Sequence, residues 1–213
     1  MDTAGQAYLV RPDSGTGPGV LLLHSWWGLT RATKDVADSL ADAGFVVVAP
    51  DLFEGERPRD ADEAIAVLGA ADPDAMAALV LSSAVALRSQ CDDPDGPIAV
   101  MGYSMGGSWA MWLATRQPET VRAVVTYYGT QSIDFEELRA PVLGHFGTDD
   151  ELVREDELTE MHAHLLLLEK DVLIHRYDGT RHGFAERAWG AAFDEPAAAL
   201  AWERTVEFLR ADH

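Results

Sequence analysis

The chain has 213 residues, of which 47% are hydrophobic, enough to form a single domain around one core. We therefore predict one domain spanning residues 1–213. Asp and Glu number 36 against 16 Lys and Arg, which gives a formal net charge of −20. Such a surface repels nucleic acid and anionic membranes, so we expect neither as a partner and instead expect a small, neutral substrate.

Cysteine content and the N-terminal segment indicate the cellular environment. Cys91 is the only cysteine, which excludes an intramolecular disulfide and any multi-cysteine metal site. Residues 1–10 lack the basic and then apolar pattern of a secretory signal. The most apolar segment, residues 20–29, is interrupted by His24 and Ser25 and is too short to span a bilayer. We expect a cytoplasmic protein without a membrane span.

Short apolar runs alternate along the chain with longer segments of helical period, which is typical of a mostly parallel sheet covered by helices. We predict strands at residues 20–24, 45–49, 98–101, 123–127, 142–146 and 172–177. Apolar side chains at helical spacing predict helices around residues 36–41, 76–87 and 202–209. The charged segment 52–60 is predicted to be an exposed loop at the carboxyl edge of the sheet, bordering the substrate site.

The most informative segment has the pattern Gly-x-Ser-x-Gly, formed by Gly102, Ser104 and Gly106 between a predicted strand and the helix-compatible run 108–116. The two glycines leave room for a sharp turn that projects Ser104 above the sheet. The amides at the start of the following helix favour negative charge beside the serine oxygen. A glycine-flanked serine is also found in ordinary turns, but this context favours a nucleophile.

A serine hydroxyl needs an imidazole to take its proton and a carboxylate to orient that imidazole. In α/β-hydrolases these follow in the order serine, acid, histidine. Asp149 and Asp150 end the predicted strand 142–146 in a polar turn; we favour Asp150, with Asp149 as the alternative. The other interpretation is that both cap the helix that begins near residue 152. His182 follows strand 172–177 in the loop where this fold carries its base.

The remaining histidines are expected to be structural or to face solvent. His162 and His164 lie two residues apart on a predicted helix and therefore on different sides of it, so we predict no metal site there. The others lie on or beside strands or at the C-terminus: His24, His145, His175 and His213.

Taken together and in this order, several motifs resemble those of the dienelactone hydrolase family over nearly the whole chain. They are His24-Ser-Trp-Trp-Gly-Leu29, Ala49-Pro-Asp-Leu52, Gly102-Tyr-Ser-Met-Gly-Gly107, Tyr127-Tyr-Gly129, Phe146-Gly-Thr-Asp-Asp150 and His182-Gly-Phe-Ala185. The resemblance implies an α/β-hydrolase fold, with a mostly parallel twisted sheet of about seven strands, helices on both faces and no cap domain. It also implies Asp150 as the acid, the backbone amides of Trp26 and Met105 as the oxyanion hole, and no cofactor.

The chain departs from the family pattern at the nucleophile. The best-known members carry a cysteine where this chain has Ser104 and a glutamate where it has Ser25. We interpret the pair of changes as coherent, because a serine needs only the histidine base and a nearby carboxylate would oppose the developing oxyanion. Cys91 lies outside the motif and is predicted to be structural.

A second departure concerns substrate recognition. Members that act on dienelactone have an arginine four residues after the catalytic histidine, where this chain has Glu186. We therefore do not expect recognition of a substrate carboxylate. Four other arginines are possible replacements but are expected to be solvated surface charges: Arg57, Arg59, Arg181 and Arg187.

The sequence thus predicts a serine hydrolase, monomeric or homodimeric, that cleaves small, short-chain or aromatic carboxylic esters at an open site. Aromatic side chains are predicted to line its pocket: Trp27, Tyr103, Tyr128 and Phe184, with Trp26 and Trp189 as further candidates. The alternatives are a dienelactone or other lactone hydrolase, and a binding protein that has lost turnover.

Overall fold

The computed structural model describes residues 7–211, whose strands form one seven-stranded sheet in the order β1-β3-β2-β4-β5-β6-β7. The strands are β1 (Ala7–Val10), β2 (Gly19–Leu23), β3 (Val46–Pro50), β4 (Ile98–Tyr103), β5 (Val121–Tyr127), β6 (Val142–Gly147) and β7 (Val172–Tyr177). Only β1 is antiparallel to its neighbour. The mostly parallel sheet predicted from the sequence is confirmed.

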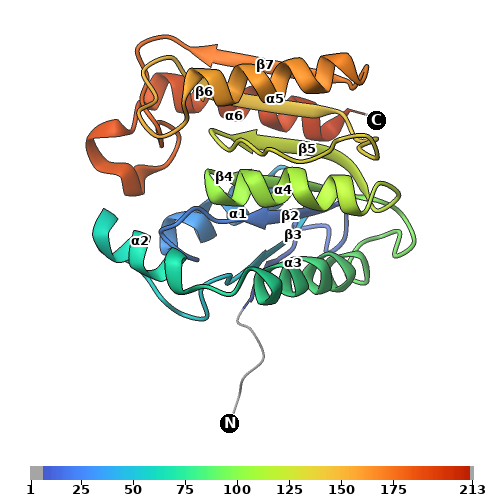
Figure 1. The fold of residues 1–213 in the computed structure, drawn as a ribbon. Coiled ribbons are helices and arrows are strands. Elements are labelled where there is room, and N and C mark those ends of the chain that lie inside the picture. The colour runs from blue at the N-terminus through green and yellow to red at the C-terminus, as the bar shows by residue number, and fades with distance from the viewer. Residues whose placement is uncertain (1–6, 212–213) are drawn as a thin grey trace.

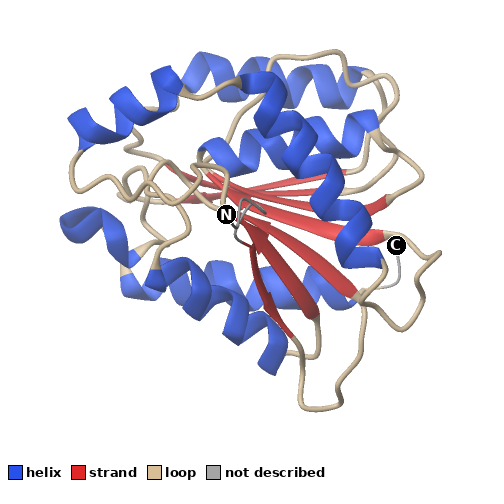
Figure 2. Cartoon of the chain, turned by 90° about the horizontal axis from the view of Figure 1, so that it is seen from below, coloured by secondary structure: helices blue, strands red, loops and turns tan. Residues whose placement is uncertain are grey.

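Helices cover both faces of this sheet (Figures 1 and 2). They are α1 (Arg31–Asp42), α2 (Ala61–Ala70), α3 (Pro73–Arg88), α4 (Met105–Arg116), α5 (Glu155–Leu167), the short 3-10 helix η1 (Arg187–Ala192) and α6 (Glu195–Arg210). In Figure 1, α3, α4 and α5 lie in front of the sheet, and α1 and α6 lie behind it.

The central strands are buried on both faces, which explains their unbroken apolar sequences. Every residue of β2, β3 and β4 is buried, whereas the edge strands β1 and β7 are only partly buried. Because the parallel strands run in one direction, their carboxyl ends meet at one edge of the sheet, at the left in Figure 1. The loops that follow β4, β6 and β7 are therefore brought together there.

Three elements were not predicted from the sequence. Strand β1 pairs with β3 at the sheet edge, α2 follows the loop 52–60, and η1 lies after the predicted base. Asp60 caps α2 by accepting a hydrogen bond from the Glu63 amide. The predicted loop 52–60 therefore ends at the N-cap residue of α2. The predictions for residues 1–6 and for His213 lie outside the described residues.

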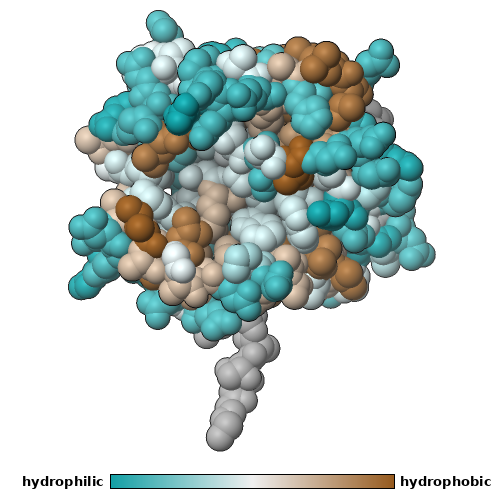
Figure 3. Space-filling model, viewed as in Figure 1, coloured by the Kyte–Doolittle hydropathy of each residue, from teal (hydrophilic) through white to brown (hydrophobic). Residues whose placement is uncertain are grey.

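Exposed hydrophobic side chains lie in separate patches on the surface. One such group, Leu166, Leu167 and Leu173, lies where α5 ends and β7 begins, at the upper right of Figure 3. Among the described helices, no single one is long and apolar enough to cross a membrane; α2 and α3 meet that criterion only as a pair bent by 88°, by length and composition.

Candidate active site

Ser104 occupies a sharp turn between β4 and α4. Its backbone has φ 50° and ψ −117°, a region that side-chain-bearing residues rarely adopt. The turn requires Gly102, because a Cβ there would lie 2.1 Å from the Gly106 carbonyl oxygen. The Ser104 amide donates to the Tyr127 carbonyl oxygen at 2.8 Å, which ties the turn to the end of β5. The serine is half-buried, with its side chain held above the sheet.

The turn also packs closely against the end of β2. A Cβ at Gly106 would lie 2.3 Å from the Leu23 carbonyl oxygen and 2.6 Å from that of His24. The loop that carries Trp26 is therefore held beside the first turn of α4. Within residues 7–211, no protein acceptor is recorded for the backbone N–H of Trp26 or of Met105. The two amides predicted to form an oxyanion hole thus both have free hydrogen-bonding capacity.

The structure brings together the three side chains that were predicted to form a triad. Nε2 of His182 lies 2.9 Å from Oγ of Ser104. Nδ1 of the same ring lies 2.9 Å from Oδ2 and 3.0 Å from Oδ1 of Asp150. His182 and Asp150 have side chains only 2% and 5% exposed, so little water competes for these contacts.

The loops that carry the acid and the base are joined by backbone hydrogen bonds. The Asp149 amide donates to the Thr180 carbonyl oxygen at 3.0 Å, and the Gly179 amide donates to Oγ1 of Thr148 at 2.8 Å. A Cβ at Gly147 would lie 2.3 Å from the Thr180 carbonyl oxygen, so glycine permits this close approach. The two loops therefore form one unit that fixes the distance between the carboxylate and the imidazole.

The structure distinguishes between the two candidate acids. Asp149 is exposed, and its side chain accepts a hydrogen bond from Oγ1 of Thr148 at 3.3 Å. Asp150 contacts His182 and also accepts hydrogen bonds from the amides of Leu152 and Val153, both at 2.8 Å. The Asp150 carboxylate therefore does both things: it contacts His182, and it caps the turn before α5. The capping bonds hold it rigidly.

The histidines on strands have structural contacts. His145 is fully buried, and its ring contacts Oη of Tyr177 at 2.8 Å and Oγ1 of Thr205 at 3.0 Å. Burial lowers the pKa of His145 to about 3 and that of His24 to about 4. In the described part of the chain, no group of three or more His, Cys, Asp or Glu side chains is arranged to hold a metal ion.

Aromatic rings surround His182. Its imidazole contacts the rings of Tyr128, at 4.7 Å between centroids, and Trp189, at 5.0 Å. Trp189 also stacks on Trp26 at 5.2 Å and contacts Trp27 at 5.4 Å. Residues 7–211 include no cap domain, and the Trp189 ring of η1 lies against the imidazole of His182 at the site that was predicted to be open.

Glu186 was not predicted to belong to the site, yet it lies within it. Its Oε1 accepts a hydrogen bond from Oγ of Ser25 at 2.7 Å, and its Oε2 accepts from Oη of Tyr128 at 2.9 Å and from Nε1 of Trp189 at 3.2 Å. A carboxylate therefore lies beside Ser25, although the loss of the family's glutamate at this position was interpreted as removing a charge that would oppose the developing oxyanion. Burial raises the pKa of the Glu186 carboxyl group.

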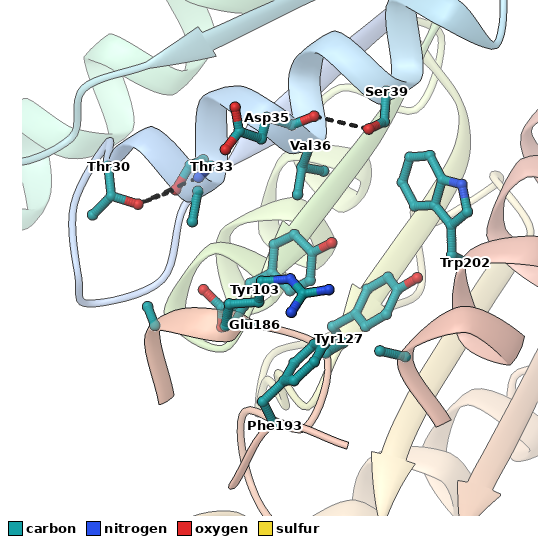
Figure 4. Close-up of a pocket in the computed structure, with 15 residues that line it drawn as sticks. Thr30, Thr33, Asp35, Val36, Ser39, Tyr103, Tyr127, Glu186, Phe193 and Trp202 are labelled. Carbon is teal, nitrogen blue, oxygen red and sulfur yellow. Dashed lines mark hydrogen bonds between the residues drawn. The ribbon is translucent and has the colours of Figure 1, made fainter. Parts of the chain in front are cut away.

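A cavity of about 340 Å³ lies beside Glu186, between α1 and α6 (Figure 4). Tyr103, Glu186, Phe193 and Trp202 are among its lining residues. Tyr103 is 4% exposed, and its ring contacts those of Tyr127 and Tyr128. Of the predicted pocket residues, Tyr103 thus lines this cavity, Tyr128 and Trp27 lie in the aromatic cluster, and Phe184 is fully buried in the core.

The four arginines considered as carboxylate-binding residues all form ion pairs with acidic side chains. Arg57 pairs with the buried Asp51 at 2.7 Å. The other pairs are Arg59 with Glu63, Arg181 with Glu151, and Arg187 with Glu195. The loop 52–60, which was predicted to border the substrate site, packs against Gly28 through Arg57 and lines a cavity beside α2.

Comparison with known proteins identifies relatives of this chain. The model of the dienelactone hydrolase family matches residues 6–212. The chain is 29% identical to the protein usf of Aquifex pyrophilus, with 96% of this chain and 92% of that one covered. It is 28% identical to carboxymethylenebutenolidase 1 of Cupriavidus pinatubonensis, with 95% and 90% covered. A solved structure of a dienelactone hydrolase-like promiscuous phosphotriesterase from metagenomic libraries superposes with a TM-score of 0.81 at 22% identity, covering 97% and 98%.

Proposed function

This chain belongs to the dienelactone hydrolase family, and we propose that it is a serine hydrolase that cleaves carboxylic esters through an acyl-enzyme on Ser104. The observation that carries the proposal is the continuous series of contacts from Ser104 through His182 to Asp150, with distances of 2.9 Å and 2.9 Å. This arrangement activates a hydroxyl for attack on an acyl carbon.

In the first half-reaction, Nε2 of His182 takes the proton of Ser104 as the serine oxygen bonds to the ester carbonyl carbon. The amides of Trp26 and Met105 donate to the resulting oxyanion. The carbon–oxygen bond to the alcohol then breaks, and the imidazolium of His182 gives its proton to the leaving alcohol. Asp150 holds the ring in the required tautomer and stabilises its cation.

In the second half-reaction, the same imidazole takes a proton from water as that water attacks the acyl carbon. The bond to Ser104 breaks, the serine oxygen regains a proton from His182, and the carboxylic acid leaves. Every proton is moved by this one histidine, so these steps need no group beyond the triad and the two backbone amides.

The surroundings of the triad support small, uncharged or aromatic acyl groups. Trp26, Trp27 and Trp189 form an apolar cluster beside the base. Trp189 leaves limited space over His182, which disfavours long-chain lipids. We propose that the site and both loops belong to a single domain spanning the chain.

A lactone is the second candidate substrate, because curated relatives are named carboxymethylenebutenolidase. A lactone is a cyclic ester, and the same series of contacts would open it, with the alcohol remaining attached to the acyl group. Dihydrocoumarin tests this possibility beside an open-chain ester.

The test is reaction of the purified protein with a fluorophosphonate probe and with p-nitrophenyl acetate. Wild type is compared with Ser104→Ala and with Ser82→Ala, a matched control in which an exposed serine on α3 is removed. We expect one adduct on Ser104 in wild type and in Ser82→Ala, together with ester turnover. In Ser104→Ala we expect no adduct and a loss of at least about a thousandfold in turnover.

If wild type is neither labelled nor faster than Ser104→Ala, the protein is a binding protein on a hydrolase scaffold. If it opens dihydrocoumarin much faster than it cleaves the open-chain ester, the lactone becomes the preferred substrate class and the serine mechanism stands.

A further inference from the structure

We propose that Glu186 is a specificity-determining residue that makes this esterase discriminate against substrates bearing a negative charge near the scissile bond and favour neutral or cationic ones. The inference rests on the proposed ester hydrolysis and adds the class of substrate.

The first argument is the fixed position of the Glu186 carboxylate. Three donors from three separate segments hold it: Ser25 after β2, Tyr128 after β5 and Trp189 in η1. Both oxygens are engaged. Burial raises the pKa of this carboxyl group, but the three donors and the nearby His182 oppose that rise by favouring the ionised form. A side chain held in this way cannot turn towards bulk water when a charged substrate approaches.

The second argument is the place of this carboxylate relative to the triad. Its donor Tyr128 contacts the imidazole of His182, and its donor Trp189 contacts the same ring from another side. Ser25 immediately precedes Trp26, whose amide is proposed to hold the oxyanion. Glu186 is therefore hydrogen-bonded to side chains that surround the reacting atoms. A substituent of the substrate that approaches Glu186 meets its negative charge.

The third argument is that the arginines nearest to Glu186 are engaged by other groups, although Arg187 lines the same cavity as Glu186. Arg187, the adjacent residue, lies over the Phe193 ring and pairs with Glu195. Arg181 pairs with Glu151 on the surface. Among the described residues, Glu186 has hydrogen bonds to two hydroxyls and one indole and no recorded ion pair with an arginine or lysine.

The fourth argument is the cavity behind Glu186. Tyr103 is 4% exposed and lines this cavity, where its hydroxyl can donate to an uncharged acceptor on a ligand. Phe193 and Trp202 supply apolar surface (Figure 4). A neutral, largely apolar group fits these walls, and the one arginine that lines them, Arg187, is paired with Glu195.

The experiment uses three p-nitrophenyl esters whose acyl chains have matched lengths: the hexanoate, the adipate monoester with a terminal carboxylate, and the 6-(trimethylammonio)hexanoate. Values of kcat/KM are measured for wild type, for Glu186→Gln and for Glu203→Gln. Glu203→Gln removes one exposed carboxylate from α6 and controls for the change in net charge. All assays are repeated in high salt, which screens the field of the whole acidic protein more than that of a buried neighbour.

We expect wild type to cleave the adipate monoester least well, in low and in high salt. In Glu186→Gln the adipate-to-hexanoate ratio of kcat/KM should rise by at least about tenfold, and the advantage of the cationic ester should fall. Glu203→Gln should leave both ratios within about twofold of wild type.

Three results would overturn the inference. The first is a wild-type kcat/KM for the adipate monoester equal to that for the hexanoate. This result can be established without any variant. The second is a Glu186→Gln ratio equal to that of Glu203→Gln. The third is an equal loss on all three esters in Glu186→Gln, which would assign Glu186 a structural role only. Hexanoate turnover that depends on Ser104 would leave the proposed function standing in each case.

Discussion

Nε2 of His182 lies 2.9 Å from Oγ of Ser104, although 78 residues separate them in the chain. The contact exists because β4 and β7 are parallel strands of one sheet and the loops after them leave at the same edge. The Asp150 loop, bonded to the His182 loop through Asp149 and Thr180, sets the orientation of the ring. Small changes in either loop are therefore expected to act on catalysis through this one distance.

Asp150→Asn is expected to lower kcat for p-nitrophenyl acetate by about a thousandfold to ten-thousandfold, because an amide can stabilise the wrong tautomer of His182 and does not stabilise its cation. Asp149→Asn is the matched control, since its carboxylate is exposed and lies one residue away. It should retain kcat within about threefold of wild type. Equal losses in the two variants, measured on proteins of comparable melting temperature, would contradict the assignment of the acid.

Gly102→Ala is expected to destabilise the protein by at least about 2 kcal/mol, because its Cβ would lie 2.1 Å from the carbonyl oxygen of Gly106 and the backbone must move. Gly69→Ala is the opposite case. Gly69 lies in α2 with no heavy atom within 4 Å of the added Cβ, and alanine should raise the free energy of unfolding by about 0.5–1 kcal/mol. Urea unfolding measures both, and a stabilised Gly102→Ala would show that the turn is not close-packed.

The sequence predicted the parts of the site that leave a local pattern. The turn at Ser104 requires Gly102 and Gly106, which lie only two residues before and two residues after it in the chain. Asp150 and His182 each follow a strand, so their place at the carboxyl edge could be inferred. The capping pattern of Asp60 followed by Glu63 also predicts the start of α2, and that signal was overlooked.

The contacts of Glu186 could not be inferred in the same way, nor could those of Trp189 with the base, although Trp189 was a candidate pocket residue. The hydrogen bonds of Glu186 join residues 25, 128 and 189, which share no periodicity or spacing that marks them as neighbours. Local patterns in one sequence report backbone geometry and burial, whereas this cluster depends on how three loops meet. How the side chains around His182 contact one another could therefore be determined only from the structure.

Stability is expected to fall in mild acid because His145 is buried without charge. Its pKa is lowered to about 3 in the folded protein from 6.5, so the unfolded state binds a proton first as pH decreases. The contribution of His145 is complete above pH 6.5 and is lost progressively between pH 6.5 and about 3. From pH 7 to pH 5 this loss amounts to about 2 kcal/mol.

His145→Gln isolates this effect from the titration of the carboxylates, which both proteins share. The variant is expected to be less stable at pH 7, because it loses contacts to Tyr177 and Thr205. The difference in unfolding free energy between wild type and variant should narrow by about 2 kcal/mol at pH 5. A difference that stays constant between the two pH values would mean that His145 accepts a proton in the folded state.

Trp189→Ala is expected to change the size of ester that the site accepts. The Trp189 ring lies against His182 and stacks on Trp26, and it packs so closely on Gly183 that a Cβ there would lie 2.1 Å from the indole. Removing the ring opens space over the base, so bulky acyl groups gain access. The ratio of kcat/KM for p-nitrophenyl benzoate to that for the acetate should rise by about tenfold.

Trp112→Ala is the matched control, because it removes an indole on α4 that contacts Trp109 and none of the proposed triad. It should leave the benzoate-to-acetate ratio within about twofold of wild type, whatever its effect on stability. If the two variants shift the ratio equally, the change comes from general loosening of the fold. If Trp189→Ala lowers turnover of both esters without altering their ratio, Trp189 instead acts by holding Glu186 and His182 in place, since its indole donates to that carboxylate.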